Sequence, residues 1–104
     1  MAKYSPGLAA APTRGRTFGY EDSFVAADSP LVLDVITDLG RNAIDGYIVN
    51  DGAGDVEIEI SNDGTTYGGT HTLKMDETFS LTNIDTAKLR LIWVANCDYR
   101  ILVV

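Results

Sequence analysis

The chain has few of the residues that form disulfides, take part in catalysis or restrict the backbone, with one cysteine, one histidine and three prolines among 104 residues. Because a single thiol has no partner within the chain, Cys97 excludes an internal disulfide and a disulfide-based secreted scaffold. A chain of this length buries about two-thirds of its unfolded surface, which is enough for one core without a disulfide or a metal. We therefore expect a single domain that needs no cofactor to fold.

Long apolar runs are also missing. The apolar run nearest the N-terminus, residues 8–11, is far shorter than a signal-peptide core, and nothing elsewhere approaches the length of a membrane span. The sequence also lacks an Asn-X-Ser/Thr glycosylation site. These absences predict a soluble protein that is made in the cytoplasm, without a secretion signal, and that does not bind membranes.

Positive charge is scarce and unevenly placed. The net charge is −7, but residues 1–16 carry three bases and no acid, which leaves 15 acids and five bases in residues 17–104. Binding of nucleic acid begins with clustered Lys and Arg that neutralise phosphates, and an acidic body repels such a partner. We expect no nucleic-acid partner.

The first sixteen residues differ from the rest. They contain two of the three prolines and no apolar periodicity, so they predict an extended arm over residues 1–16 followed by a β domain over residues 17–104. A frayed terminus is one interpretation. The other is a segment that orders on a neighbouring subunit, with its apolar side chains buried and its positive charges on an acidic surface.

From residue 17 onward, short β-rich runs alternate with turn residues, which is typical of an all-β sandwich or a jelly-roll-like barrel of seven or eight antiparallel strands. We expect almost no helix. The predicted strands cover residues 18–26, 31–37, 44–50, 55–61, 70–74, 78–82, 88–94 and 99–104. Gly46 falls inside the third strand, where a bulge or a close approach of another backbone would favour glycine.

The stretch DVEIEISNDGTTYGG, residues 55–69, alternates acidic and apolar residues before a turn. Period 2 sends Val56, Ile58 and Ile60 to the core and the carboxylates to water. The Asn-Asp-Gly sequence that follows, residues 62–64, predicts a tight hairpin turn. It does not match a calcium-binding loop, so the acidic residues indicate hairpin architecture and no metal site.

The last two strands are apolar on both sides, a pattern expected of strands that are covered on both faces. The extra apolar side chains predict either burial beneath a loop or contact between subunits. The candidates for subunit contact are Ile92, Val94, Leu102 and Val104.

Catalytic motifs are absent from the sequence, including phosphate-binding loops, nucleophile elbows and C-x-x-C. A Cys97–His71 pair is the one candidate for nucleophilic catalysis, but Cys97 falls in a predicted turn with nothing to lower its pKa. We expect a protein that is not an enzyme. Sugar binding is a separate alternative, because an exposed Tyr67 after the turn would offer an aromatic platform beside carboxylates.

From residue 35 to residue 104 the order of motifs resembles small β-domains of tailed-bacteriophage virion proteins. The motifs are ITDLGR (36–41), NDG (50–52), VEIEISNDGTTY (56–67), TLKMDETFSL (72–81) and LRLIWVANCDYRI (89–101). Such domains occur in capsid decoration (cement) proteins, head fibres and tail modules. With almost the whole chain in one domain, the resemblance implies a decoration protein that binds the outer surface of the capsid shell.

The resemblance implies the major capsid protein as partner and a homo-oligomer, with a trimer suggested by quasi-threefold sites. The arm is then the clamp that stabilises the shell. Its expected contact residues come from the arm argument, and they are Lys3, Tyr4, Leu8, Arg14 and Arg16. Head-fibre, tail-associated and carbohydrate-binding modules remain the alternatives.

Overall fold

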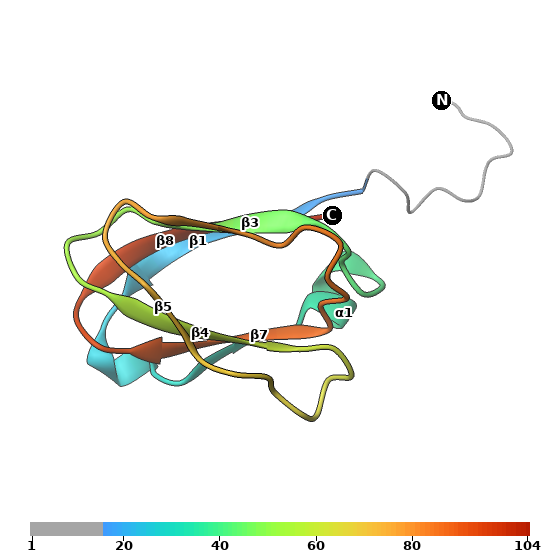
Figure 1. The fold of residues 1–104 in the computed structure, drawn as a ribbon, viewed down its shortest axis with the longest axis horizontal. Coiled ribbons are helices and arrows are strands. Elements are labelled where there is room, and N and C mark those ends of the chain that lie inside the picture. Colours follow the sequence, from blue (N-terminus) through green and yellow to red (C-terminus); the bar gives the residue numbers. More distant parts are fainter. Residues whose placement is uncertain (1–15) are drawn as a thin grey trace, which may run out of the picture.

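The computed structural model describes residues 16–104, which form two four-stranded β-sheets packed face to face (Figure 1). The strands are β1 (Phe18–Phe24), β2 (Leu31–Leu33), β3 (Gly46–Asn50), β4 (Val56–Ser61), β5 (His71–Leu73), β6 (Thr78–Ser80), β7 (Lys88–Trp93) and β8 (Cys97–Val103). A 3₁₀ turn, η2 (Ala26–Asp28), and one short helix, α1 (Val35–Leu39), complete the described elements. The prediction of an all-β sandwich is confirmed.

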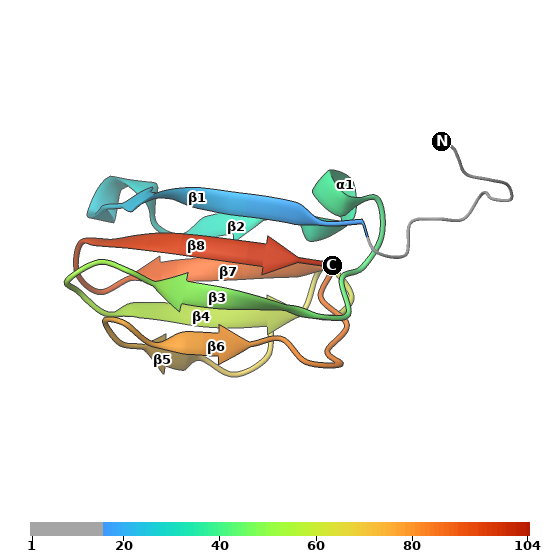
Figure 2. The ribbon, with the colours of Figure 1, turned by 90° about the horizontal axis from the view of Figure 1, so that it is seen from above.

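The strand order is that of a jelly roll. Sheet A has the order β1-β8-β3-β6, and sheet B has the order β2-β7-β4-β5 (Figure 2). Antiparallel pairs join β1 to β8, β2 to β7, β3 to β6 and β4 to β5. The first and second halves of the chain thus run antiparallel to each other as four strand pairs. Successive pairs alternate between the two sheets, which is the jelly-roll arrangement.

The core lies between the sheets and follows the period-2 pattern of the strands. In β4, Val56 and Ile58 are buried while Glu57 and Glu59 face outward. In β8 the buried set alternates in the same way and comprises Cys97, Tyr99, Ile101 and Val103. The expected division into one dry and one wet face holds for residues 56–59, whereas Ile60 is only half-buried and Ser61, expected to face water, is buried.

The prediction of a strand over residues 31–37 is correct for residues 31–33 and wrong for the rest. Strand β2 ends at Leu33 and the chain turns into α1, whose first turn is capped by Asp34, with the carboxylate accepting the Thr37 N–H at 3.3 Å. Val35 and Leu39, four residues apart, are buried, and Gly40 ends the helix with φ of +94°. None of the helices formed by residues 16–104 is long and apolar enough to cross a membrane.

The predicted tight hairpin at residues 62–64 is a wider connection. Strand β4 ends at Ser61 and β5 begins at His71, with an isolated bridge between Ser61 and Tyr67 in between. Side chains of the turn, those of Ser61 and Asp63, accept hydrogen bonds from its backbone N–H groups. The chain can therefore reverse without a two-residue turn.

The last strand also begins earlier than expected, because Cys97 is the first residue of β8 and lies buried.

Gly46 makes the close backbone approach that the sequence indicates. A Cβ at this position would lie 2.1 Å from the carbonyl oxygen of Leu102 on the neighbouring strand, and its φ is +152°. Both the space and the backbone conformation exclude a side chain here.

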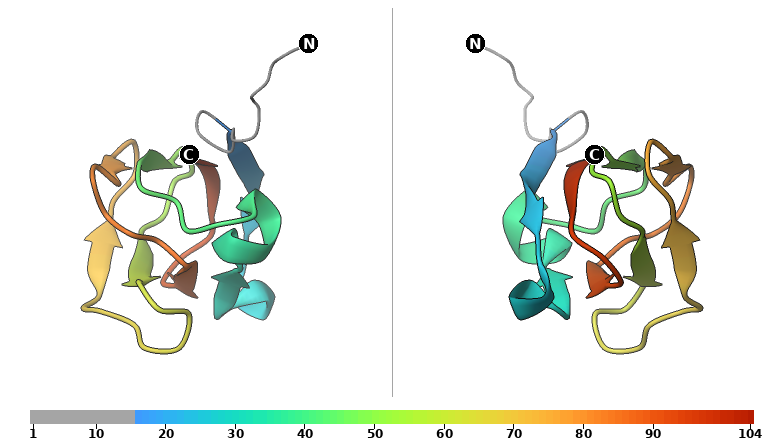
Figure 3. Two further views of the ribbon diagram at one scale, coloured as in Figure 1. Left: turned by 90° about the vertical axis from the view of Figure 1, so that its right-hand side faces the viewer. Right: turned by 90° about the vertical axis from the view of Figure 1, so that its left-hand side faces the viewer.

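The two sides of the sandwich are covered differently. Seen end on, α1 and η2 lie on the side of β1 and β2, whereas β5 and β6 lie together on the opposite side (Figure 3). On the helical side, Tyr20 of β1 donates a hydrogen bond of 2.7 Å to the carboxylate of Asp38 in α1. Among residues 16–104, strands β5 and β6 are each paired on one edge only, and we call the side of the sandwich that their outer edges border the open side.

Candidate functional site

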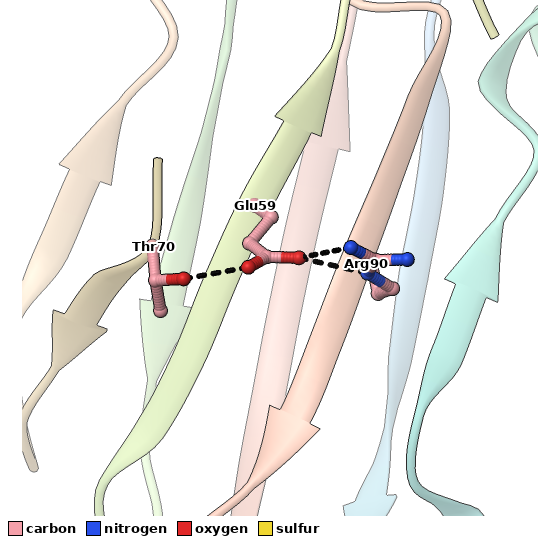
Figure 4. Close-up of polar contacts among 3 residues, drawn as sticks. All are labelled: Glu59, Thr70 and Arg90. Carbon is pink, nitrogen blue, oxygen red and sulfur yellow. Dashed lines mark hydrogen bonds and ion pairs between the residues drawn. The ribbon is translucent and has the colours of Figure 1, made fainter. Parts of the chain in front are cut away.

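The outer face of sheet B carries a row of polar contacts that crosses two strands (Figure 4). Arg90 of β7 lies opposite Glu59 of β4, and its Nε donates to Glu59 Oε1 at 2.8 Å. Thr70, just before β5, donates its hydroxyl to the other oxygen of Glu59. The hydrogen bond from Thr70, and after it that from Arg90, lowers the pKa of the Glu59 carboxyl. Glu59 is thus a negative charge with both oxygens engaged.

Tyr67 extends this row. Its ring lies on the Arg90 guanidinium, with Arg90 Cζ 3.9 Å from the ring centroid, and its side chain is half-buried. A guanidinium at this distance is held by cation–π attraction. The sequence predicts a more exposed tyrosine, and a sugar would have access only to the ring face that Arg90 leaves open.

In the turn after β4, the acidic side chain of Asp63 is hydrogen-bonded to the turn itself. The Asp63 carboxylate accepts backbone N–H groups from Thr66 and Thr65, each at 2.8 Å, and these bonds lower its pKa. Ser61, buried under the turn, donates its hydroxyl to the same oxygen at 3.2 Å. No group of three or more potential metal ligands lies close together within residues 16–104. The Asp63 side chain therefore organises the turn.

The outer face of sheet A has an open, acidic depression of about 560 Å³ around Arg100. Arg100 forms an ion pair with Asp51, whose pKa is lowered chiefly by the hydrogen bond from Arg100. Glu21 and Asp98 line the same depression. With Asp22, four carboxylates surround one guanidinium, so this face is net acidic and unfavourable for binding the phosphates of nucleic acid.

The four residues predicted for subunit contact lie on two different faces. Ile92 and Val94 belong to β7 and its end in sheet B, whereas Leu102 and Val104 belong to β8 and its end in sheet A. Val94 is 43% exposed, and the other three are half-buried. They form two separate small patches, so a single interface cannot use all four.

Of the five predicted contact residues of the arm, Lys3, Tyr4, Leu8 and Arg14 lie outside the described residues. Arg16 is described and exposed, and its Nη1 lies 3.1 Å from the position that a Cβ on Gly40 would take. Its guanidinium is thus beside the C-terminal end of α1, where the helix carbonyls favour a positive charge. Arg16 therefore lies close to α1 of its own domain.

A small pocket opens between β5 and β6, on the open side of the sandwich. Its volume is about 210 Å³, and its walls are mainly apolar, with Ile58, Ile60, Phe79 and Ile84 joined by His71 and Asn62. The His71 and Phe79 rings lie 4.9 Å apart, centroid to centroid. We call this the edge pocket.

The edge pocket does not unite the predicted catalytic pair. Cys97 is absent from the pocket walls and lies in the core, where burial raises the pKa of its thiol. A buried, protonated thiol is a poor nucleophile. The structure places His71 in a cleft but gives it no nucleophile from among the described residues that line it.

Several of these groupings were beyond sequence reasoning. Glu59 and Arg90 carry opposite charges on outward positions, but they meet only in the register that pairs β4 with β7. Phe79 and His71 meet because two edge strands lie on the same side of the sandwich. The alternation of residues along a strand predicts which face a side chain lies on. Which side chain of another strand it contacts depends on the strand order and register, and these cannot be read from the sequence pattern.

Comparison with protein-family models, with curated proteins and with solved structures finds no match to this chain.

Proposed function

We propose that this protein is a capsid decoration protein of a tailed bacteriophage, a non-enzymatic domain that binds the outer surface of the capsid shell through residues 1–16. The observation that supports the proposal is that residues 18–103 supply all eight strands of the two described sheets, with a core between them made by side chains of the described residues. On this proposal, the basic leader is the segment that binds another molecule.

The charge distribution also supports separate roles for the leader and the domain. Residues 1–16 hold three bases and no acid, while the domain is strongly acidic. The acidic depression around Arg100 would repel a second acidic domain approaching face to face, whereas the leader offers a segment of opposite charge. A leader that binds the assembled shell and not its free subunits stabilises the shell by mass action.

Jelly rolls occur in viral capsid domains and in lectins, and a fold by itself does not decide between these uses. The proposal therefore depends on the motif resemblance together with the separate leader. Contact through Lys3, Tyr4, Leu8, Arg14 and Arg16 is the starting hypothesis for the shell-binding surface.

The test is to locate the protein on particles. We expect it to sediment with capsids, to label the capsid surface in electron micrographs and to raise the temperature at which capsids break. Labelling confined to tails or fibres would replace this function with the tail-associated alternative. Glycan binding that disappears in Tyr67→Ala, without attachment to particles, would replace it with the carbohydrate-binding alternative.

A further inference from the structure

The edge pocket has the composition of a site for one aromatic side chain. Ile58 and Ile60 are inward-facing residues of β4, so the pocket reaches the apolar interior. The tilted His71–Phe79 ring pair gives it an aromatic wall, which favours a further ring in edge or offset contact. Asn62 and His71 add polar groups that suit a hydroxyl on that ring.

The surroundings of the pocket suit an extended peptide. Strands β5 and β6 both present a backbone edge without a partner strand in residues 16–104, and an added strand would pair with such an edge. The rim at Gly69 is open, because a Cβ there would meet no atom within 4 Å. A backbone can approach the pocket closely at this point.

A strand added along β5 with an aromatic residue in the pocket would send the neighbouring side chains outward. On the outer face of sheet B, Thr72 of β5 pairs with Glu57 of β4. Glu57 is half-buried, and its carboxylate has no hydrogen bond or ion pair with any other residue in 16–104, unlike that of Glu59, which is held by Arg90 and Thr70. The face beside the pocket therefore offers an unpaired carboxylate to a cation next to the aromatic residue.

We infer that the edge pocket binds Tyr4 from the leader of a second copy of this chain, with Lys3 directed towards Glu57. Tyr4 is the one aromatic residue of segment 1–15, it follows Lys3, and residues 1–5 contain no proline to interrupt strand pairing. The twelve residues from Tyr4 to Arg16 span about 40 Å when extended, enough to reach a neighbouring copy.

This inference deepens the proposed function, because it assigns the tip of the leader to a neighbouring decoration protein and leaves Leu8, Arg14 and Arg16 for the shell. Copies linked in this way would hold one another on the particle by avidity. Its test contains no particles, so the two proposals can fail separately.

The first experiment adds an unlabelled peptide of residues 1–8 to isotope-labelled full-length protein and follows the backbone signals. We expect shifts at Gly69, His71 and Phe79, and affinity weaker by about tenfold or more for the peptide carrying Tyr4→Ala, the loss typical of truncating an aromatic anchor. Gly69→Leu should narrow the pocket mouth and abolish the shifts. Thr66→Leu places the same leucine side chain in the same loop but outside the pocket lining, and should leave the shifts intact.

Two further variants test the ion pair. Glu57→Gln should weaken peptide binding and reduce its dependence on salt, whereas Glu21→Gln, on the outer face of sheet A, should change neither. If the peptide leaves the three pocket signals unmoved, or binds equally well with Ala at position 4, the inference is overturned.

The second experiment separates a neighbouring copy from the same copy. A spin label on the N-terminus of unlabelled full-length protein should broaden the His71 and Phe79 signals of isotope-labelled, spin-free protein mixed with it. The broadening should increase with protein concentration and disappear when the spin-labelled copy carries Tyr4→Ala. Broadening found only within molecules that carry the spin label themselves would show docking in the same copy and overturn the inference.

Discussion

At the scale of single residues, Asp63 makes the acidic turn sensitive to pH. Its pKa in the folded protein is lowered by the backbone N–H groups of Thr66 and Thr65, so its stabilising contribution is present above the ordinary carboxyl pKa and is lost as the pH falls. We expect the free energy of unfolding to fall from about pH 5 towards about pH 2. Asp63→Asn should flatten this decline, as measured by denaturant unfolding at several pH values.

Asp85→Asn is the matched control, because the Asp85 carboxylate accepts no hydrogen bond from any residue in 16–104. The hydrogen bond that Asp85 accepts from Asn62 is made by its backbone carbonyl, which the substitution leaves in place. It should leave the pH dependence close to that of the unchanged protein. An Asp63→Asn profile as steep as the original would contradict the assignment of the acid-sensitive contribution to this turn.

Gly46 gives a second prediction at this scale. Gly46→Ala forces a Cβ against the Leu102 carbonyl in a backbone conformation that disfavours side chains, and should cost about 2 kcal/mol or more of unfolding free energy. Gly69→Ala, where the space is open, should stay within about 0.5 kcal/mol of the original. Thermal or denaturant unfolding of both variants measures the difference, and equal stabilities would refute the proposed steric cause.

At the scale of elements, one hydrogen bond ties the first strand to the only described helix. Tyr20→Phe removes the bond to Asp38 and should lower the free energy of unfolding by about 1 kcal/mol. Tyr47→Phe removes a hydroxyl without a hydrogen bond to residues 16–104, and a change within about 0.5 kcal/mol is expected. Equal effects of the two substitutions, measured by denaturant unfolding, would show that the Tyr20–Asp38 bond does not stabilise the docking of α1.

The elements also show how far sequence patterns reach. Alternation in residues 55–61 identified β4, and the two faces of residues 56–59, correctly, because a strand half-covered by a core leaves a period-2 signal. The same reasoning missed α1, a five-residue helix too short to display a 3.6-residue period, although the Asp34 cap and Gly40 mark its ends. The edge pocket was not predictable, since Ile58 and Phe79 come from different sheets and meet only through the jelly-roll order.

At the scale of the whole molecule, we propose that the β domain folds on its own and that the leader works on other molecules. Among the described residues, those of the buried core run from Phe24 to Val103. Removal of residues 1–15 should therefore leave the amide spectrum of the domain nearly unchanged and shift the melting temperature by only a few degrees. A collapse of the spectrum or of the melting transition would show that the leader belongs to the fold.

The most direct measurement compares attachment to capsids for three proteins, which are the full-length chain, the chain without residues 1–15, and the full-length chain with Leu8, Arg14 and Arg16 changed to Ala. Co-sedimentation over a range of protein concentrations gives the bound fraction of each. The account predicts saturable binding of the unchanged chain and loss of binding in both altered proteins, all three having folded domains. Undiminished binding of the leaderless domain would contradict it.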